Sequence, residues 1–375
     1  RLDADGSYSE YFIASSSVEL KMFGRNTATG VFTNVSVKEA TIDNLPRVDY
    51  TDGTSSLLVE PQSTNLIPNA NQYAGNTVYY TVTPNQSSPD GENNATLFVE
   101  KTVTANYSVT SDNASIVGGQ TYAYSFFVKY AGKQNIPVNA TDGVSGFNAN
   151  IDILNGTVNS GTAEIKNFGN GWFRVLMTRT AAASASNAKI LFNFGNQTGD
   201  GTSGFYLFGY QIEQLSYATS YIKTSGSTVT RNQETYEKTG ISNLINSTEG
   251  VLFVETEGLT DDLTTNELIS ISDGSTSNRL YLYRSSTDNK YAFAVFVGGA
   301  LQVNIKSGVV DFTTNSKIAV KYKLNDFSLW VDGIEVATDT SGSVFSSGAL
   351  NRLGFDDGVG AGNEFFGKVK QLQVY

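Results

Sequence analysis

Trp330, near the end of the chain, has the surroundings expected of a ligand-binding side chain. In the segment 327–332 (Phe-Ser-Leu-Trp-Val-Asp), strand alternation separates the aliphatic residues from Trp330 and Asp332. The preceding segment, 317–324, places Lys321 on the same polar face. An exposed aromatic ring packs on the apolar face of a sugar, and polar groups beside it bind the hydroxyls. The alternative is that a loop or another domain covers Trp330.

A second aromatic pair, Tyr281 and Tyr283, follows the same rule. In the segment 279–284 (Arg-Leu-Tyr-Leu-Tyr-Arg), alternation places both tyrosines with Arg279 on one face and the leucines on the other. If this strand lies beside that of Trp330, the tyrosines extend the same polar face. The alternative is a ladder of cross-strand pairs that stabilises the sheet without binding a ligand.

Asp356 and Asp357 precede a glycine and offer carboxylate oxygens, the ligands that Ca²⁺ prefers. They indicate a possible calcium site, with no other cofactor expected. However, Ca²⁺ takes six or more oxygens, and the chain has no EF-hand or nonapeptide repeat. An Asp-Gly pair is also a common turn, which is the competing interpretation.

The chain contains no histidine and no cysteine, which removes the commonest general base and all thiolate chemistry. Glu255 and Glu257 are two residues apart on one strand face, about 7 Å, a spacing that suits an inverting pair of carboxylates. Neither has a visible third partner. The sequence therefore favours binding over catalysis. The alternative is a glycan depolymerase, either a polysaccharide lyase or a glycoside hydrolase, on the same scaffold.

The elements that must position these residues are strands. Apolar residues recur with period two in short segments bounded by Gly, Asn, Asp and Ser, which predicts an all-β fold of tandem jelly-roll β-sandwiches. The net charge of −11 argues against a nucleic-acid partner, and no apolar run is long enough for membrane insertion. Charged residues make up 16% of the chain, so its polar surface is mostly Ser, Thr, Asn and Gly.

Three regions are predicted along the chain: a small N-terminal β region at 1–60, a sandwich similar to carbohydrate-binding modules at 61–235, and a jelly roll at 249–375. The Ser/Thr/Asn-rich stretch 223–248 is the boundary between the last two. Trp172 is expected to have a structural role in the middle region, because large aromatics in sandwiches are mostly packing residues. Arg1 in place of Met suggests a fragment or a processed product.

Several segments resemble tail-fibre and receptor-binding proteins of bacteriophages. The last region is similar to concanavalin A-like, or laminin-G-like, domains at 327–333 and 366–375. The phage resemblance rests on the segments 45–50, 56–66, 171–175, 208–213, 218–222 and 228–231.

This resemblance implies a non-catalytic host-recognition protein that binds a surface polysaccharide or other glycan. It also implies a homotrimer that assembles with other virion tail proteins, located in the virion tail or at a cell surface. A bacterial surface adhesin built from the same modules is the alternative.

Overall fold

The computed structural model describes residues 46–50, 53–360 and 362–375. Within them the regular structure is almost entirely β, with one short 3₁₀ helix, η1 (Thr77–Tyr79). The predicted all-β class is confirmed. Most of the predicted N-terminal region, residues 1–45, lies outside the described residues. No helix in the described part of the chain is long and apolar enough to cross a membrane.

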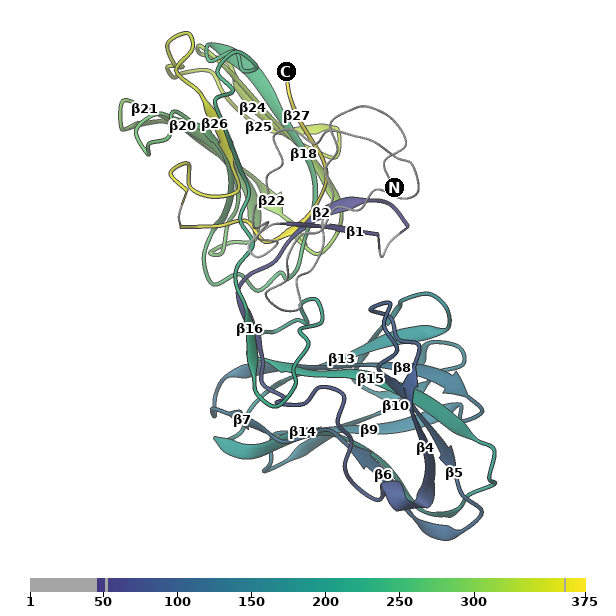
Figure 1. Cartoon of the computed structure of the whole chain (residues 1–375). Coiled ribbons are helices and arrows are strands. Elements are labelled where there is room, and N and C mark those ends of the chain that lie inside the picture. Colours follow the sequence, from purple (N-terminus) through teal and green to yellow (C-terminus); the bar gives the residue numbers. More distant parts are fainter. Residues whose placement is uncertain (1–45, 51–52, 361) are drawn as a thin grey trace, which may run out of the picture. The chain divides into compact units, whose positions relative to one another are not determined.

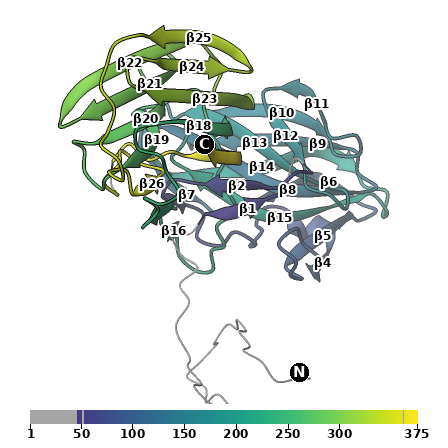
Figure 2. The same cartoon turned by 90° about the horizontal axis from the view of Figure 1, so that it is seen from above.

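The first β-sandwich is built from two antiparallel sheets (Figures 1 and 2). Sheet 1 has the order β11-β10-β9-β14-β6, with β7 paired to β14, and sheet 2 has the order β12-β13-β8-β15-β5-β4. The strands are β4 (Tyr80–Gln86), β5 (Ala95–Glu100), β6 (Thr104–Thr110), β7 (Ala114–Ile116), β8 (Thr121–Ala131), β9 (Asn135–Thr141), β10 (Gly146–Asp152), β11 (Thr157–Gly161), β12 (Glu164–Asn167), β13 (Trp172–Thr180), β14 (Ala185–Thr198) and β15 (Gly204–Glu213).

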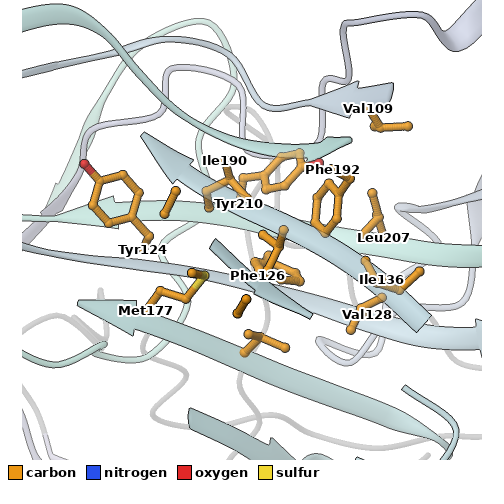
Figure 3. Close-up of a cluster of buried hydrophobic side chains, with 14 of the residues drawn as sticks. Val109, Tyr124, Phe126, Val128, Ile136, Met177, Ile190, Phe192, Leu207 and Tyr210 are labelled. Carbon is orange, nitrogen blue, oxygen red and sulfur yellow. The ribbon is translucent and has the colours of Figure 1, made fainter. Parts of the chain in front are cut away.

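Large aromatic side chains fill the space between sheets 1 and 2 (Figure 3). Phe126 of β8 meets Phe192 of β14 edge-to-face, with ring centroids 4.9 Å apart. Tyr210 of β15 is fully buried in the same cluster. Because side chains alternate across a strand, each strand gives every second residue to this core and the others to the outer face. The outer faces are therefore where ligand contacts must be sought.

The second β-sandwich also has two antiparallel sheets. Sheet 3 has the order β1-β2-β27-β18-β23-β24-β25, and sheet 4 has the order β17-β26-β19-β20-β21-β22. The strands are β1 (Arg47–Asp49), β2 (Ser56–Val59), β17 (Glu237–Thr239), β18 (Glu249–Gly258), β19 (Glu267–Ser272), β20 (Arg279–Arg284), β21 (Lys290–Val297), β22 (Ala300–Val309), β23 (Ser316–Lys323), β24 (Phe327–Val331), β25 (Ile334–Asp339), β26 (Arg352–Gly354) and β27 (Gly367–Val374).

The strands β1 and β2 belong to the second sandwich, although they precede the first in sequence. β2 pairs with β27, so that Leu57 lies opposite Val369, and β1 pairs with β2. The prediction had assigned these residues to a separate region ending at residue 60. The chain thus starts sheet 3, builds the first sandwich, and then returns to complete the second. Two short paired strands, β3 (Ser63–Asn65) and β16 (Val229–Arg231), mark the entry and the exit.

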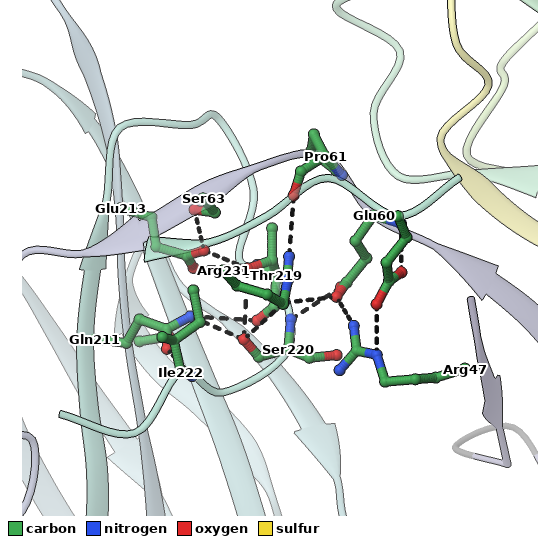
Figure 4. A network of polar contacts seen from close by, with 12 residues as sticks. Arg47, Glu60, Pro61, Ser63, Gln211, Glu213, Thr219, Ser220, Ile222 and Arg231 are labelled. Carbon is green, nitrogen blue, oxygen red and sulfur yellow. Dashed lines mark hydrogen bonds and ion pairs between the residues drawn. The ribbon is translucent and has the colours of Figure 1, made fainter. Parts of the chain in front are cut away.

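The segments that resemble phage proteins, apart from 171–175, meet in a polar network at this entry and exit (Figure 4). Asn65 donates to the carbonyls of Tyr210 and Ile222 at 3.0 Å each, and its own carbonyl accepts the N–H groups of Ile67 and Ile212. A buried amide that satisfies four backbone groups fixes the paths of three segments at once. Asn65, in the phage-like segment 56–66, therefore has a structural role.

Ion pairs complete the network. Glu60 and Glu234 are both buried. The backbone N–H of Glu60 donates to the carboxylate of Glu234, and the backbone N–H of Glu234 donates to the carbonyl of Glu60. Arg47 contacts both carboxylates, and Arg231 lies 2.9 Å from that of Glu60. Burial raises the pKa of Glu234 even though Arg47 favours its ionised form. Two buried carboxylates are tolerated here because two guanidinium groups neutralise them.

Candidate functional site

In β20, which contains the segment 279–284, the leucines and the tyrosines lie on opposite faces, as predicted. Leu280 and Leu282 are buried in the core of the second sandwich. Tyr281 and Tyr283 lie on the outer face of sheet 4, where Tyr281 is half-buried and Tyr283 is 8% exposed. Burial raises the pKa of both phenols, so both stay neutral and can donate a hydrogen bond.

The ring of Tyr281 has a partner on the next strand. Phe296 of β21 lies in register with Arg279, and the rings of Tyr281 and Phe296 are stacked with centroids 6.1 Å apart. The guanidinium carbon of Arg279 lies 5.0 Å from the centroid of Tyr281 and 5.2 Å from that of Phe296. These three side chains are called the aromatic shelf below. Both rings are half-buried, so part of each is accessible.

Small residues keep the shelf open along the sheet. Ala294 of β21 lies opposite Tyr281, and Asn304 of β22 lies opposite Ala294. The phenol oxygen of Tyr283 lies 3.2 Å from the side-chain oxygen of Asn304, to which it donates. Beside the shelf, therefore, lies the amide of Asn304, whose two N–H donors have no partner among the described residues. An amide of this kind binds a sugar hydroxyl.

Asp357 positions the cation of the shelf. Arg279 donates to the backbone oxygen of Asp357 and lies 3.8 Å from its carboxylate. Burial raises the pKa of Asp357, although Arg279 and a backbone N–H favour its ionised form. Its neighbour Asp356 is buried and binds Arg352, and it accepts the N–H of Gly358 at 2.7 Å.

This arrangement bears on the expected calcium site. The guanidinium of Arg352 occupies both carboxylate oxygens of Asp356. In the described residues no cluster of three or more acidic, histidine or cysteine side chains could hold a metal ion. The two aspartates thus contact two arginines in this structure.

Trp330 lies on the outer face of sheet 3 and is 38% exposed, while Phe327 and Leu329 fill the core as predicted. Its indole N–H donates to the hydroxyl of Ser328 at 3.0 Å. Lys321 of β23 is on the same face, with its ammonium 2.5 Å from the carboxylate of Asp326. The structure brings Trp330 and Lys321 together on one face.

Asp332 occupies the turn between β24 and β25, with a positive φ of 50°. Its carboxylate accepts the N–H of Lys317 at 2.8 Å, and its own N–H donates back to the carbonyl of Lys317. Asp332 thus ties the turn between β24 and β25 to the start of β23, which accounts for its position after the strand.

The expectation that the tyrosines extend the face of Trp330 is not met. β20 pairs with β19 and β21 in sheet 4, whereas β24 pairs with β23 and β25 in sheet 3. The shared core lies between these two sheets, so the two sets of side chains belong to opposite outer faces. Alternation had identified the correct face of each strand, but it carries no information about which strands are neighbours.

The predicted carboxylate pair lies on sheet 3. Glu255 accepts the amide of Asn315 at 2.9 Å and is 4.0 Å from the ammonium of Lys317. Glu257 lies opposite Lys368 in the register of β18 and β27. Glu255 is thus part of a cross-strand charge pair that stabilises the sheet, and the lysine opposite Glu257 lies 2.9 Å from the carboxylate of Asp49.

Trp172 has the structural role that was predicted. It is 4% exposed and packs with Phe127 and Phe208 on the outer face of sheet 2. Arg174 lies over the ring of Phe127, with 5.2 Å between the guanidinium carbon and the ring centroid.

No family model matches the chain, and no curated protein matches it. Similar solved structures include the CBM40 of Ruminococcus gnavus IT-sialidase bound to α2,3-sialyllactose, a SAP-like pentraxin from Limulus polyphemus and sheep galectin-11. Their sequence identities are 15%, 11% and 9%, and their TM-scores are 0.31, 0.27 and 0.25. The matches cover 38%, 35% and 38% of this chain and 90%, 64% and 97% of those chains. At these values they give no information about the ligand of this chain.

Proposed function

We propose that the protein binds a carbohydrate through the aromatic shelf on sheet 4. The observation that carries this proposal is the stacked pair Tyr281 and Phe296, with the guanidinium of Arg279 within 5.2 Å of both ring centroids. Two accessible ring surfaces fit the apolar face of a pyranose, and Arg279 and Asn304 supply donors for its hydroxyls. The predicted tyrosines thus take part, with Phe296 added from the neighbouring strand.

The biological setting we propose is host recognition by a non-catalytic part of a virion tail fibre, located in the virion or at a cell surface. Its support is the resemblance of the segments that enter and leave the first sandwich to phage receptor-binding proteins. A homotrimer with other tail proteins as partners fits this setting, because three weak sites on one particle bind a glycan-coated surface far more tightly than one. A monomer in light scattering at micromolar concentration would contradict the trimer.

The test is a glycan array probed with the full chain and with Tyr281→Ala, Phe296→Ala and Trp330→Ala. Binding by the wild type and by Trp330→Ala, but not by the two shelf variants, is the expected result. Loss of binding in Trp330→Ala alone would move the site to sheet 3, where Lys321 lies beside that ring. New reducing ends or unsaturated products on incubation with a bound polysaccharide would overturn the non-catalytic part of the proposal.

A further inference from the structure

The outer face of sheet 1, in the first sandwich, is almost uncharged. Asp152 and Lys189 are the charged residues in its five main strands, β6, β9, β10, β11 and β14. Asp152 closes the turn after β10, where it accepts the N–H groups of Leu154 and Asn155. Lys189 lies opposite Thr141, in the next pair on this face after Leu191 and Asn139. The centre of the face, between Asp152 and Lys189, therefore contains neutral side chains, whereas sheet 3 carries cross-strand pairs of Lys and Glu.

Asparagine dominates this centre. Asn148 of β10 lies opposite Asn139 of β9, and Asn139 lies opposite Leu191 of β14. One step along the sheet, Asn150 lies opposite Pro137 and opposite Ser160 of β11. The result is two neighbouring cross-strand rows, one that runs from Asn148 through Asn139 to Leu191 and one that runs from Ser160 through Asn150 to Pro137 (strand positions in Figure 2). Asn135, Asn159 and Asn193 are further amides on these strands.

Hydrogen bonds between the amides orient them. Asn139 donates to the carbonyl of Asn148 at 2.6 Å. Asn159 donates to Asn135 at 2.7 Å and to Asn150 at 3.0 Å. These bonds use the carbonyl oxygens of Asn135, Asn148 and Asn150. The N–H donors of these three amides have no hydrogen-bond partner among the described residues. The face is thus a fixed array of free donors, with the carbonyl oxygen of Asn139 left to accept.

The array lines a groove of about 280 Å³. Pro137 and Leu191 contribute apolar surface, and Asn139, Asn148, Asn150, Ser160 and Asn193 contribute polar groups. Its volume is close to the lower end of the range for ligand sites. A Cβ on Gly146 would lie 2.5 Å from the amide of Asn139, so this glycine leaves the space that the amide occupies.

We propose that this asparagine face is a second binding site, specific for a neutral, hydroxyl-rich chain such as an uncharged oligosaccharide. Each hydroxyl of a sugar both donates and accepts, and an amide offers the same two functions without a charge. A charged ligand would leave water for a face with no counter-charge at its centre, which disfavours it. The proposal is independent of the aromatic shelf, because the two sites are built from different sandwiches.

The alternative is that the amides only pair across strands and stabilise the sheet. Calorimetry on the full chain carrying Tyr281→Ala separates the two, since this background removes the shelf. The probes are neutral hexasaccharides of glucose and mannose, with oligogalacturonate as the anionic comparison. The double variant Asn148→Ala/Asn150→Ala removes two donors, and Ser160→Trp fills the groove without removing an amide. Asn106→Ala, on β6 of the same sheet outside the groove, is the matched control.

We expect at least one neutral hexasaccharide to bind, about tenfold more weakly to either groove variant and equally to Asn106→Ala. Raising the salt concentration should leave this affinity unchanged, because no charge pair forms. No binding of any neutral probe, equal binding by Ser160→Trp, or preference for oligogalacturonate would each overturn the proposal. Loss of binding at the aromatic shelf, which Tyr281→Ala is designed to cause, would not overturn the proposal. A failure of one site can therefore be distinguished from a failure of the other.

Discussion

The rings of Tyr281 and Phe296 lie on neighbouring strands with their planes within 18° of each other. Cross-strand aromatic neighbours usually gain most by burying each other, yet both rings remain half-buried here. Arg279 lies against both of them and is anchored by Asp357. A flat apolar surface next to a fixed guanidinium is prepared for a ligand before the ligand arrives, which reduces the entropy lost on binding.

Arg279→Lys is expected to weaken glycan binding by about fivefold to tenfold while keeping the charge. A guanidinium can stack on two rings and still donate to Asp357, whereas an ammonium cannot do both. Calorimetry with a glycan taken from the array measures the change. Lys321→Ala, on sheet 3, is the control and should bind like the wild type. A stronger effect in the control would place the site beside Trp330.

Asn65→Ala should destabilise the first sandwich by about 3 kcal/mol or more, because it leaves four buried backbone groups without partners. Urea unfolding monitored by near-UV circular dichroism measures the loss. Asn106→Ala, an exposed asparagine, should change the free energy of unfolding by less than about 0.5 kcal/mol. Similar values for both variants would show that the network around Asn65 is dispensable.

Acid should destabilise the fold through Asp142. Burial opposes its ionisation, but the N–H groups of Ala182, Ser145 and Val144 and the charge of Arg179 outweigh it and lower the pKa to about 2. A depressed carboxyl pKa adds stability above its unfolded value near 4, and this is lost as the pH falls toward 2. Melting temperatures of the wild type and Asp142→Asn should therefore differ at neutral pH and converge near pH 2. A constant difference across this range would contradict the assignment.

Calcium is expected to leave the melting temperature unchanged, because Arg352 occupies both oxygens of Asp356. Scanning calorimetry with millimolar calcium or with a chelator tests this. A rise with calcium that disappears in Asp356→Asn would instead support the metal site that the sequence suggested.

Period-two alternation was sufficient to predict the class of fold and the faces of individual strands. Phe327 and Leu329 face the core and Trp330 faces outward, as the pattern indicated. Alternation could not show that the strand of Tyr281 belongs to a different sheet from that of Trp330, since strand order depends on pairing between distant segments. The pairing of β2 with β27, which lie at opposite ends of the described chain, escaped prediction for the same reason.

Phe296 was missed because its strand is apolar on both faces. Tyr291, Phe293 and Val295 are in the core, while Ala292, Ala294 and Phe296 are on the outer face, so the sequence offers no polar contrast. The small residues of this strand were the signal that could have indicated a site on its outer face. Ala294 lies opposite Tyr281 and Ala292 lies opposite Tyr283, and they leave room that larger residues would have filled.

The antiparallel pairing of β3 with β16 places the first and last residues of the first sandwich next to each other, with Ser63 opposite Arg231. The first sandwich is therefore an inserted domain. If it were removed, a short turn between β3 and β16 would be enough to rejoin the rest of the chain. Recombination between genes can exchange such a unit without disturbing the strands that precede and follow it. A lineage could in this way acquire a new ligand specificity in one event, while sheets 3 and 4 remain as they are.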